Sequence, residues 1–219
     1  MLYECETHGY FRGELCPICG EEGKFLMNDD ELERIGRTMA GALRHFPDKF
    51  DLEMDEQGFV SLREFIRALQ NHQRRFHWVR PHHIIAIIET DPKGRYQVSN
   101  DLIRATYGHT IELDLRLPTD NIPPELYYPT TQEETEIILE TGLKPSDRKM
   151  VHLSKTYGNA MSAGMVRTEN PVILAIDTER AIDDGYEVQK AGKTVYLTRE
   201  VPSDYLSRAE IPEEEEMID

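Results

Sequence analysis

The stretch DEQGFVSLREFIRALQ, residues 55–70, brings a turn, a short strand and an amphipathic helix together in sixteen residues. The segment DEQGFVSL predicts a turn that leads into a short strand. Ser61 and Glu64 have the spacing of a capping box, so we expect a helix to begin here. The apolar residues that recur at helical spacing predict its buried face: Leu62, Phe65, Ile66 and Leu69.

A first helix is expected upstream, because Asn28 and Glu31 also have the spacing of a capping box. Pro47 ends this helix, since the residue before a proline disfavours helical dihedral angles. Arg44 and His45 lie off its buried face, where a ligand could reach them. That face is predicted to consist of Leu32, Ile35, Met39, Leu43 and Phe46.

A third helix is predicted to begin near Pro81, and Gly94 then turns the chain into a strand over 95–99. Three helices followed by a small β-ribbon are typical of a winged-helix module, which often binds nucleic acid. The second half differs: TIELDLRL (110–117) alternates like a half-buried strand, and LPTDNIPPEL (117–126) predicts a connector. The segments after it predict one helix, 131–143, ended by Gly142, and strands within 171–177 and 193–202.

We therefore expect an α+β protein with a zinc knuckle, a winged-helix-like lobe and a β-rich second lobe. The expected boundaries are 1–27 for the zinc-ribbon-like module, 28–110 for the winged-helix-like lobe, 111–124 for the connector, 125–209 for the β-rich lobe and 210–219 for an acidic tail.

The composition narrows the class of protein. The formal net charge is −16, and the sequence contains neither a signal-peptide pattern nor a long apolar run. We expect a cytoplasmic monomer that does not bind membranes, with a solvated tail at IPEEEEMID. Within this acidic chain, residues 61–95 carry a net charge of +4, which favours one locally bound anionic partner over a plain solvated helix face.

All three cysteines fall within the first 19 residues. Cys5 and His8 form a C-x2-H pair, and Cys16 and Cys19 form a C-x2-C pair, which together predict a tetrahedral zinc site. A disulfide or a redox C-x2-C motif is the alternative, but three cysteines cannot all pair and His8 would remain unexplained. Four protein ligands close the site, so we expect the zinc to be structural.

Seven blocks in order resemble the NAD-dependent RNA 2′-phosphotransferases, over about residues 29–207. The blocks are ALRHFP, DEQGFVSLREFI, KGRYQV, IRATYGHT, GLKPSDRKMVHLS, VILAID and YLTREVPSDYL. The resemblance implies that a winged-helix lobe holds RNA carrying an internal 2′-phosphate, as in tRNA splicing, and that an ADP-ribosyltransferase-like lobe holds NAD. It also implies a catalytic set of Arg44, His45, Arg104 and Arg148.

The family chemistry explains this choice of residues. The RNA 2′-phosphate displaces nicotinamide from NAD and forms an RNA-2′-phospho-ADP-ribose intermediate. The ribose 2″-hydroxyl then attacks the phosphorus and releases 2′-OH RNA and ADP-ribose 1″,2″-cyclic phosphate. Arginines suit a reaction that needs positioning and charge stabilisation, and His45 is suited to shuttle a proton in the second step.

For NAD, the resemblance favours His152 and Ser154 of VHLS, with Thr130 and Arg167 as looser matches. Tyr128 and Pro129 stand where the family usually has histidine and glycine, which departs from the pattern on the adenosine side. The alternative to the enzyme is a non-catalytic nucleic-acid-binding regulator whose second lobe senses NAD or ADP-ribose. Retention of all four catalytic positions favours the enzyme.

Overall fold

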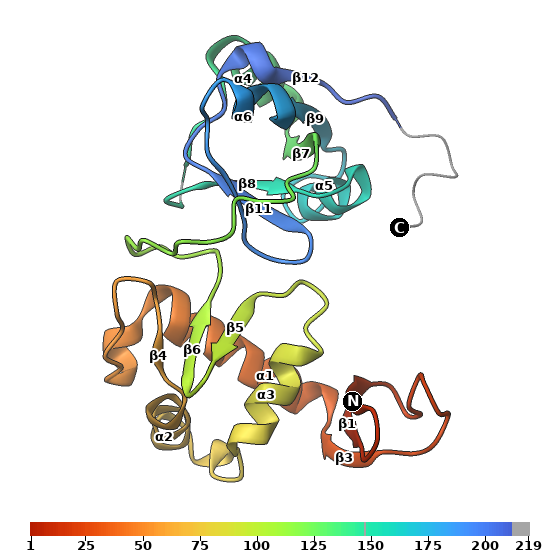
Figure 1. Ribbon diagram of the computed structural model, residues 1–219, viewed down its shortest axis with the longest axis vertical. Helices are drawn as coiled ribbons and strands as arrows, with labels where there is room; N and C mark the ends of the chain where they lie inside the picture. Colours follow the sequence, from red (N-terminus) through yellow and green to blue (C-terminus); the bar gives the residue numbers. More distant parts are fainter. Residues whose placement is uncertain (147, 212–219) are drawn as a thin grey trace. The chain divides into compact units, whose positions relative to one another are not determined.

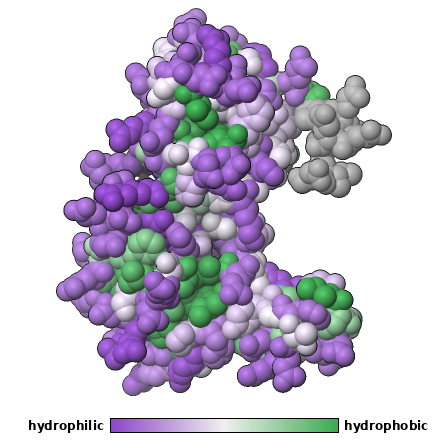
Figure 2. All heavy atoms as spheres, viewed as in Figure 1, coloured by the Kyte–Doolittle hydropathy of each residue, from purple (hydrophilic) through white to green (hydrophobic). Residues whose placement is uncertain are grey.

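The computed structural model describes residues 1–146 and 148–211, and the chain divides into two compact units, Met1–Arg116 and Leu117–Asp219 (Figure 1). Both units combine helices with antiparallel sheets, so the expected α+β class is confirmed. The division falls inside the stretch that we expected to be a connector. The predicted acidic tail lies, from residue 212 onward, outside the described residues. Most of the face drawn in Figure 2 is hydrophilic, in keeping with a chain in which 30% of the residues are charged.

The first unit begins with a three-stranded antiparallel sheet in the order β2-β1-β3. The chain passes from β3 into helix α1, and the predicted cap is confirmed: Asn28 Oδ1 accepts from the backbone N–H of Glu31, and Glu31 accepts from that of Asn28. The bounds are β1 Leu2–Cys5, β2 Gly9–Arg12, β3 Lys24–Met27 and α1 Asp29–Ala40.

The rest of this unit packs two further helices and a second antiparallel sheet, β4-β6-β5, around one apolar core. Ser61 Oγ accepts from the backbone N–H of Glu64, so the predicted start of α2 is confirmed. The predicted start of the third helix at Pro81 is also confirmed. The bounds are α2 Leu62–His72, α3 Pro81–Glu89, β4 Val60–Ser61, β5 Tyr96–Ser99 and β6 Leu102–Ala105, with short turns η1 Gly41–His45, η2 Pro47–Phe50 and η3 Arg74–Phe76.

The prediction that Phe46 is buried is wrong, because its side chain is 49% exposed. Helix α1 does not continue regularly to Pro47 but widens into one π-helical turn, η1. A π-turn inserts an extra residue into the helical repeat, so the residues after it leave the face predicted from a 3.6-residue period. Phe46 instead packs under the ammonium group of Lys49, whose Nζ lies 4.3 Å from the ring centroid.

The second unit is built on a six-stranded antiparallel sheet in the order β10-β11-β8-β7-β9-β12. Helix α4 ends at Gly142, as predicted, where φ of +84° suits glycine. The strands are β7 Glu125–Thr130, β8 Val151–Ser154, β9 Val172–Asp177, β10 Val188–Lys190, β11 Val195–Thr198 and β12 Leu206–Arg208, and the helices are α4 Gln132–Thr141, α5 Tyr157–Gly164, α6 Thr178–Asp183 and η4 Ser203–Tyr205.

The predicted strand at 110–117 is wrong. Side chains there do alternate between half-buried and exposed, as the pattern indicates, but the segment joins no sheet. Its Asp114 N–H donates to the Glu56 carbonyl oxygen, and Arg116 has a φ of +46°, which is incompatible with an extended strand. The alternation therefore reflects a loop lying over the surface of the first unit.

Candidate functional site

Arg44 and His45 are the last two residues of the π-helical turn η1, which Phe46 caps before Pro47 begins the short turn η2. A loop that follows β6 holds this turn from the other side. The backbone N–H of Thr110 donates to the Arg44 carbonyl oxygen at 3.1 Å, and the Thr110 hydroxyl lies 3.2 Å from His45 Nδ1. The two side chains therefore have a defined orientation, although both are only half-buried.

Two tyrosine rings hold the Arg44 guanidinium. Its Cζ lies 4.9 Å from the ring centroid of Tyr107 and 5.6 Å from that of Tyr96. Gly108 lies against the same guanidinium, so close that a Cβ atom there would be 3.2 Å from Arg44 Nη1. Tyr96, Tyr107 and Gly108 together form what we call the cage of Arg44. Burial raises the pKa of both tyrosines, so both phenols are neutral at neutral pH.

Arg104 is held in a different way. It is only 5% exposed, its Nε donates to Gln97 Oε1 at 2.9 Å, and its Nη1 donates to the carbonyl oxygens of Gln57 and Leu115 at 3.0 and 2.6 Å. The ring of Phe59 lies 4.3 Å from its Cζ. These hydrogen bonds leave Nη2 with no hydrogen-bond partner among the described residues.

Arg44 and Arg104 approach the β5–β6 hairpin from opposite faces. Along a strand, neighbouring side chains point to opposite sides. Ala105, paired with Tyr96, belongs to the apolar core, whereas Arg104, paired with Gln97, points to the other side. The structure therefore brings Arg44 and His45 together but holds Arg104 separately.

The loop from Tyr107 to Thr110 is the part of the site that sequence reasoning missed. In the block IRATYGHT the resemblance implies a role for Arg104 alone, yet the later residues provide the ring, the glycine and the hydroxyl that position Arg44 and His45. The glycine in this block was the available signal, since a φ of +83° at Gly108 requires a residue without a Cβ atom.

In the second unit, His152 and Ser154 point to one face of the sheet. Both lie on β8, two residues apart, and Ser154 is paired with Tyr127 on β7. His152 Nδ1 lies 3.0 Å from the Met150 carbonyl oxygen, which orients the imidazole ring. Tyr128 follows Tyr127 and therefore points to the opposite face, where it packs against the apolar core of this unit.

Thr130 and Arg167 meet at a shallow depression formed by the end of β7 and the end of α5, which is lined also by Pro129, Thr131, Gly164 and Thr168. Glu134 connects the two: its Oε1 lies 3.3 Å from Arg167 Nη2, and its Oε2 lies 3.4 Å from the Thr130 hydroxyl. Pro129 packs against Gly164, where an added Cβ would lie 2.9 Å from the proline Cβ.

Arg148 lies exposed on the loop between α4 and β8. It belongs to the second unit, while Arg44, His45 and Arg104 belong to the first. Each unit thus presents part of the predicted catalytic set on its own elements.

At the N-terminus, the four predicted metal ligands converge. The ligand atoms of Cys5, His8, Cys16 and Cys19 all lie within 4.8 Å of one another. Cys5 Sγ lies 3.8 Å from Cys19 Sγ and 3.5 Å from His8 Nδ1, and Cys16 Sγ lies 3.6 Å from the same nitrogen. All three cysteines are free thiols, so the disulfide alternative is wrong.

These separations fit tetrahedral zinc. Bonds of about 2.3 Å to sulfur and about 2.05 Å to nitrogen place two sulfurs about 3.8 Å apart, and a sulfur and a nitrogen about 3.5 Å apart. The backbone N–H of Cys19 lowers the pKa of Cys16 to about 6, so this sulfur is largely the metal-binding thiolate at neutral pH.

Comparison with known proteins shows the family of the chain. Residues 30–200 match the model of the family described as "RNA 2'-phosphotransferase, Tpt1 / KptA family". The chain belongs to this family. It is 44% identical to a probable RNA 2′-phosphotransferase of Thermoplasma acidophilum, over 94% of this chain and 88% of that protein. It is 38% identical to one of Methanosarcina mazei, over 94% of this chain and 98% of the other.

The protein is therefore an enzyme of the RNA 2′-phosphotransferase family, as its sequence blocks indicated. The family model leaves unmatched the N-terminal module that carries the Cys/His cluster. None of the helices in the described part of the chain combines the length and apolar composition that crossing a lipid bilayer requires.

Proposed function

We propose that the enzyme transfers an internal RNA 2′-phosphate to NAD, releasing nicotinamide, 2′-OH RNA and ADP-ribose 1″,2″-cyclic phosphate. The observation that carries this proposal is the cage around Arg44 and the orientation of His45 beside it. A caged guanidinium with a neighbouring imidazole supplies what phosphoryl transfer requires, which is a fixed cation for the phosphate oxygens and a group that moves a proton.

The proposal assigns a lobe to each substrate. Residues 28–110 form a winged-helix-like lobe that binds tRNA-like RNA, and residues 125–209 form an ADP-ribosyltransferase-like lobe that binds NAD. Residues 111–124 connect them. Exposed arginines on α2 and η3 support the first assignment: Arg63, Arg67, Arg74 and Arg75. Arg95 does not belong to this basic surface, because it forms an ion pair with the buried carboxylate of Asp91.

When bound, NAD supplies the ribose carbon that the phosphate attacks and the 2″-hydroxyl that resolves the intermediate. Arg44, Arg104 and Arg148 bind the phosphate oxygens, and the charge that they neutralise matters most when the phosphorus becomes the electrophile. His45 transfers a proton to the departing RNA 2′-oxygen in this second step, and Thr110 fixes its ring for that transfer.

On the NAD side, His152 and Ser154 are the stronger candidates, because the same sheet face presents both. Thr130 and Arg167 contribute at the edge of the depression. Tyr128 packs against the core and is the weakest member of the predicted set. The N-terminal module binds one structural zinc through Cys5, His8, Cys16 and Cys19.

The test uses an RNA with a radiolabelled internal 2′-phosphate, incubated with and without NAD. Loss of the phosphate only in the presence of NAD is expected. An unchanged phosphate with NAD would refute the enzyme assignment and favour the regulator. His45→Ala should accumulate RNA-2′-phospho-ADP-ribose at saturating substrates. Thr110→Val should do the same to a lesser degree, and Thr110→Ser, which keeps the hydroxyl, should accumulate less than Thr110→Val.

A further inference from the structure

The metal-binding module is anchored in the first unit rather than attached loosely to it. Leu2 and Met27, at the two ends of the module, are fully buried in the apolar core of that unit. Cys5 and Cys16 form a small cluster of their own with Phe11. Cys5 is the last residue of β1 and His8 directly precedes β2, and both strands lie against helix α3.

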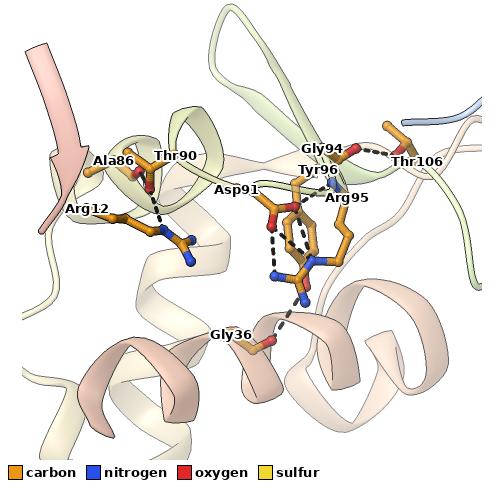
Figure 3. A network of polar contacts seen from close by, with 9 residues as sticks. All are labelled: Arg12, Gly36, Ala86, Thr90, Asp91, Gly94, Arg95, Tyr96 and Thr106. Atoms are coloured by element: carbon orange, nitrogen blue, oxygen red, sulfur yellow. Dashed lines mark hydrogen bonds and ion pairs between the residues drawn. The ribbon is translucent and has the colours of Figure 1, made fainter. Parts of the chain in front are cut away.

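Arg12, the last residue of β2, reaches the C-terminal end of α3. Its Nε donates to the Thr90 hydroxyl at 3.2 Å, and this hydroxyl in turn donates to the Ala86 carbonyl oxygen at 2.7 Å (Figure 3). A cation at this end of a helix interacts favourably with the partial negative charge of its last carbonyl groups. Arg12 therefore stabilises the end of α3.

The end of α3 leads directly into a buried ion pair. The side chain of Asp91 is 1% exposed, its Oδ1 lies 2.8 Å from Arg95 Nη2, and its Oδ2 accepts from the Arg95 backbone N–H at 2.6 Å (Figure 3). Burial lowers the pKa of Arg12, while the charge of Asp91 raises it, so the two groups interact. A buried carboxylate needs such cations nearby, since it has lost its hydration.

The same segment supports the cage of Arg44. Arg95 Cζ lies 5.8 Å from the Tyr96 ring centroid, and Tyr96 is one of the two rings that hold Arg44. The Thr106 hydroxyl donates to the Gly94 carbonyl oxygen at 3.3 Å, which ties this bend to the start of the loop that positions His45 (Figure 3). A continuous set of contacts therefore runs from the module to the cage.

The charge of the module argues against direct contact with RNA. Residues 1–27 contain five acidic side chains and two basic ones, a net charge of −3. Phosphate binding requires the opposite sign. One of the two basic side chains is Arg12, which already contacts the end of α3.

We propose that the metal-binding module is a brace for the catalytic turn, and that Arg12 is the positioning residue through which it acts on Arg44. The inference rests on the proposed function of Arg44. It assigns the module an intramolecular role, in which the metal holds β2 so that Arg12 fixes the end of α3, the Asp91–Arg95 pair and the Tyr96 ring.

The test compares Arg12→Ala with Arg37→Ala. Arg37 is an exposed arginine of α1 that forms an ion pair with Glu33, so it is a matched control. For Arg12→Ala we expect unchanged metal content, an RNA Kd within twofold of wild type, and a kcat about two- to fivefold lower, as expected from losing one charge at a helix end. Amide hydrogen exchange at 90–96 should be faster. Arg12→Lys should restore part of both effects.

Removal of the metal with a chelator provides a second test that does not depend on activity. Exchange at 90–96 should rise as in Arg12→Ala, while exchange in β8 stays unchanged. A weaker RNA Kd with unchanged exchange at 90–96 would overturn the brace and make the module an RNA contact. Identical behaviour of Arg12→Ala and Arg37→Ala would also overturn it. If the wild-type enzyme failed to use NAD, the proposed function would be refuted. Amide hydrogen exchange at 90–96 would still show whether the module is coupled to this segment.

Discussion

Replacing Gly108 with alanine tests whether the cage around Arg44 matters for turnover. Gly108 has a φ of +83°, and an added Cβ would lie 3.2 Å from Arg44 Nη1, 3.3 Å from Cζ and 3.5 Å from Nε. The left-handed conformation costs an L-residue about 1–2 kcal/mol. The guanidinium must also move by a few tenths of an ångström, because contacts this short are rare.

The backbone strain and the displacement of the guanidinium can be measured separately. We expect Gly108→Ala to lower the free energy of unfolding by about 1–2 kcal/mol. Misplacing a catalytic group by about 1 Å costs about a hundredfold in rate, so a shift of a few tenths should cost about tenfold. Unfolding in urea gives the first value, and release of the 2′-phosphate at saturating RNA and NAD gives the second.

Gly185→Ala is the matched control. Gly185 also has a left-handed φ, +97°, but an added Cβ would meet no atom within 4 Å. The Gly185→Ala variant should therefore lose stability to a similar degree and keep the turnover of the wild type. Equal turnover of the two variants would refute the reasoning, because strain alone would then account for Gly108→Ala.

Three further predictions concern the metal, pH and RNA binding. Cys16→Ser should lose the bound zinc, measured by metal analysis, and speed exchange in the first 27 residues while the second unit stays folded. Burial, reinforced by nearby cationic groups, lowers the pKa of His83 to about 4, whereas the pKa in the unfolded chain is about 6.5. The stability that the neutral side chain contributes is therefore complete above pH 6.5 and is lost as the pH falls toward 4. When the pH is lowered from 7 to 5, the free energy of unfolding of the wild type should therefore fall by about 2 kcal/mol more than that of His83→Asn. Urea unfolding at both pH values measures this difference. Replacing Arg74 and Arg75 with alanine should reduce the slope of log Kd against log salt for RNA by about 1.5, and an unchanged slope would exclude them from the interface.

Local signals in the sequence predicted the elements of the fold well. Capping residues at Asn28 and Ser61 and the stop at Gly142 each specify a helix end through contacts within a few residues. The convergence of the four Cys and His side chains was predictable for the same reason, because their spacing within two short turns limits the geometry.

What the sequence could not predict depends on contacts between distant residues or on irregular backbone. The π-helical turn exposes Phe46, and no periodic pattern reveals it. The 110–117 segment alternates like a strand but has no strand to pair with. The opposite orientations of Tyr128 and Ser154 follow from sheet register, which pairs residues far apart in the chain.

The two arginines of the first unit show how packing separates two roles that look alike in sequence. Arg104 is fixed through its N–H donors, which bond to a side-chain amide and two backbone carbonyl groups. Arg44 is held mainly by aromatic rings, since its Cζ lies 4.9 Å from the ring centroid of Tyr107 and 5.6 Å from that of Tyr96. Its side chain also hydrogen-bonds that of Tyr107. Phosphate is recognised through the N–H donors of a guanidinium. Ring contacts act on the charge of the cation, whereas each of the three hydrogen bonds of Arg104 commits an N–H group to the protein itself. This difference makes Arg44 the residue on which turnover should depend most directly, and Arg104 the one whose loss should also cost stability.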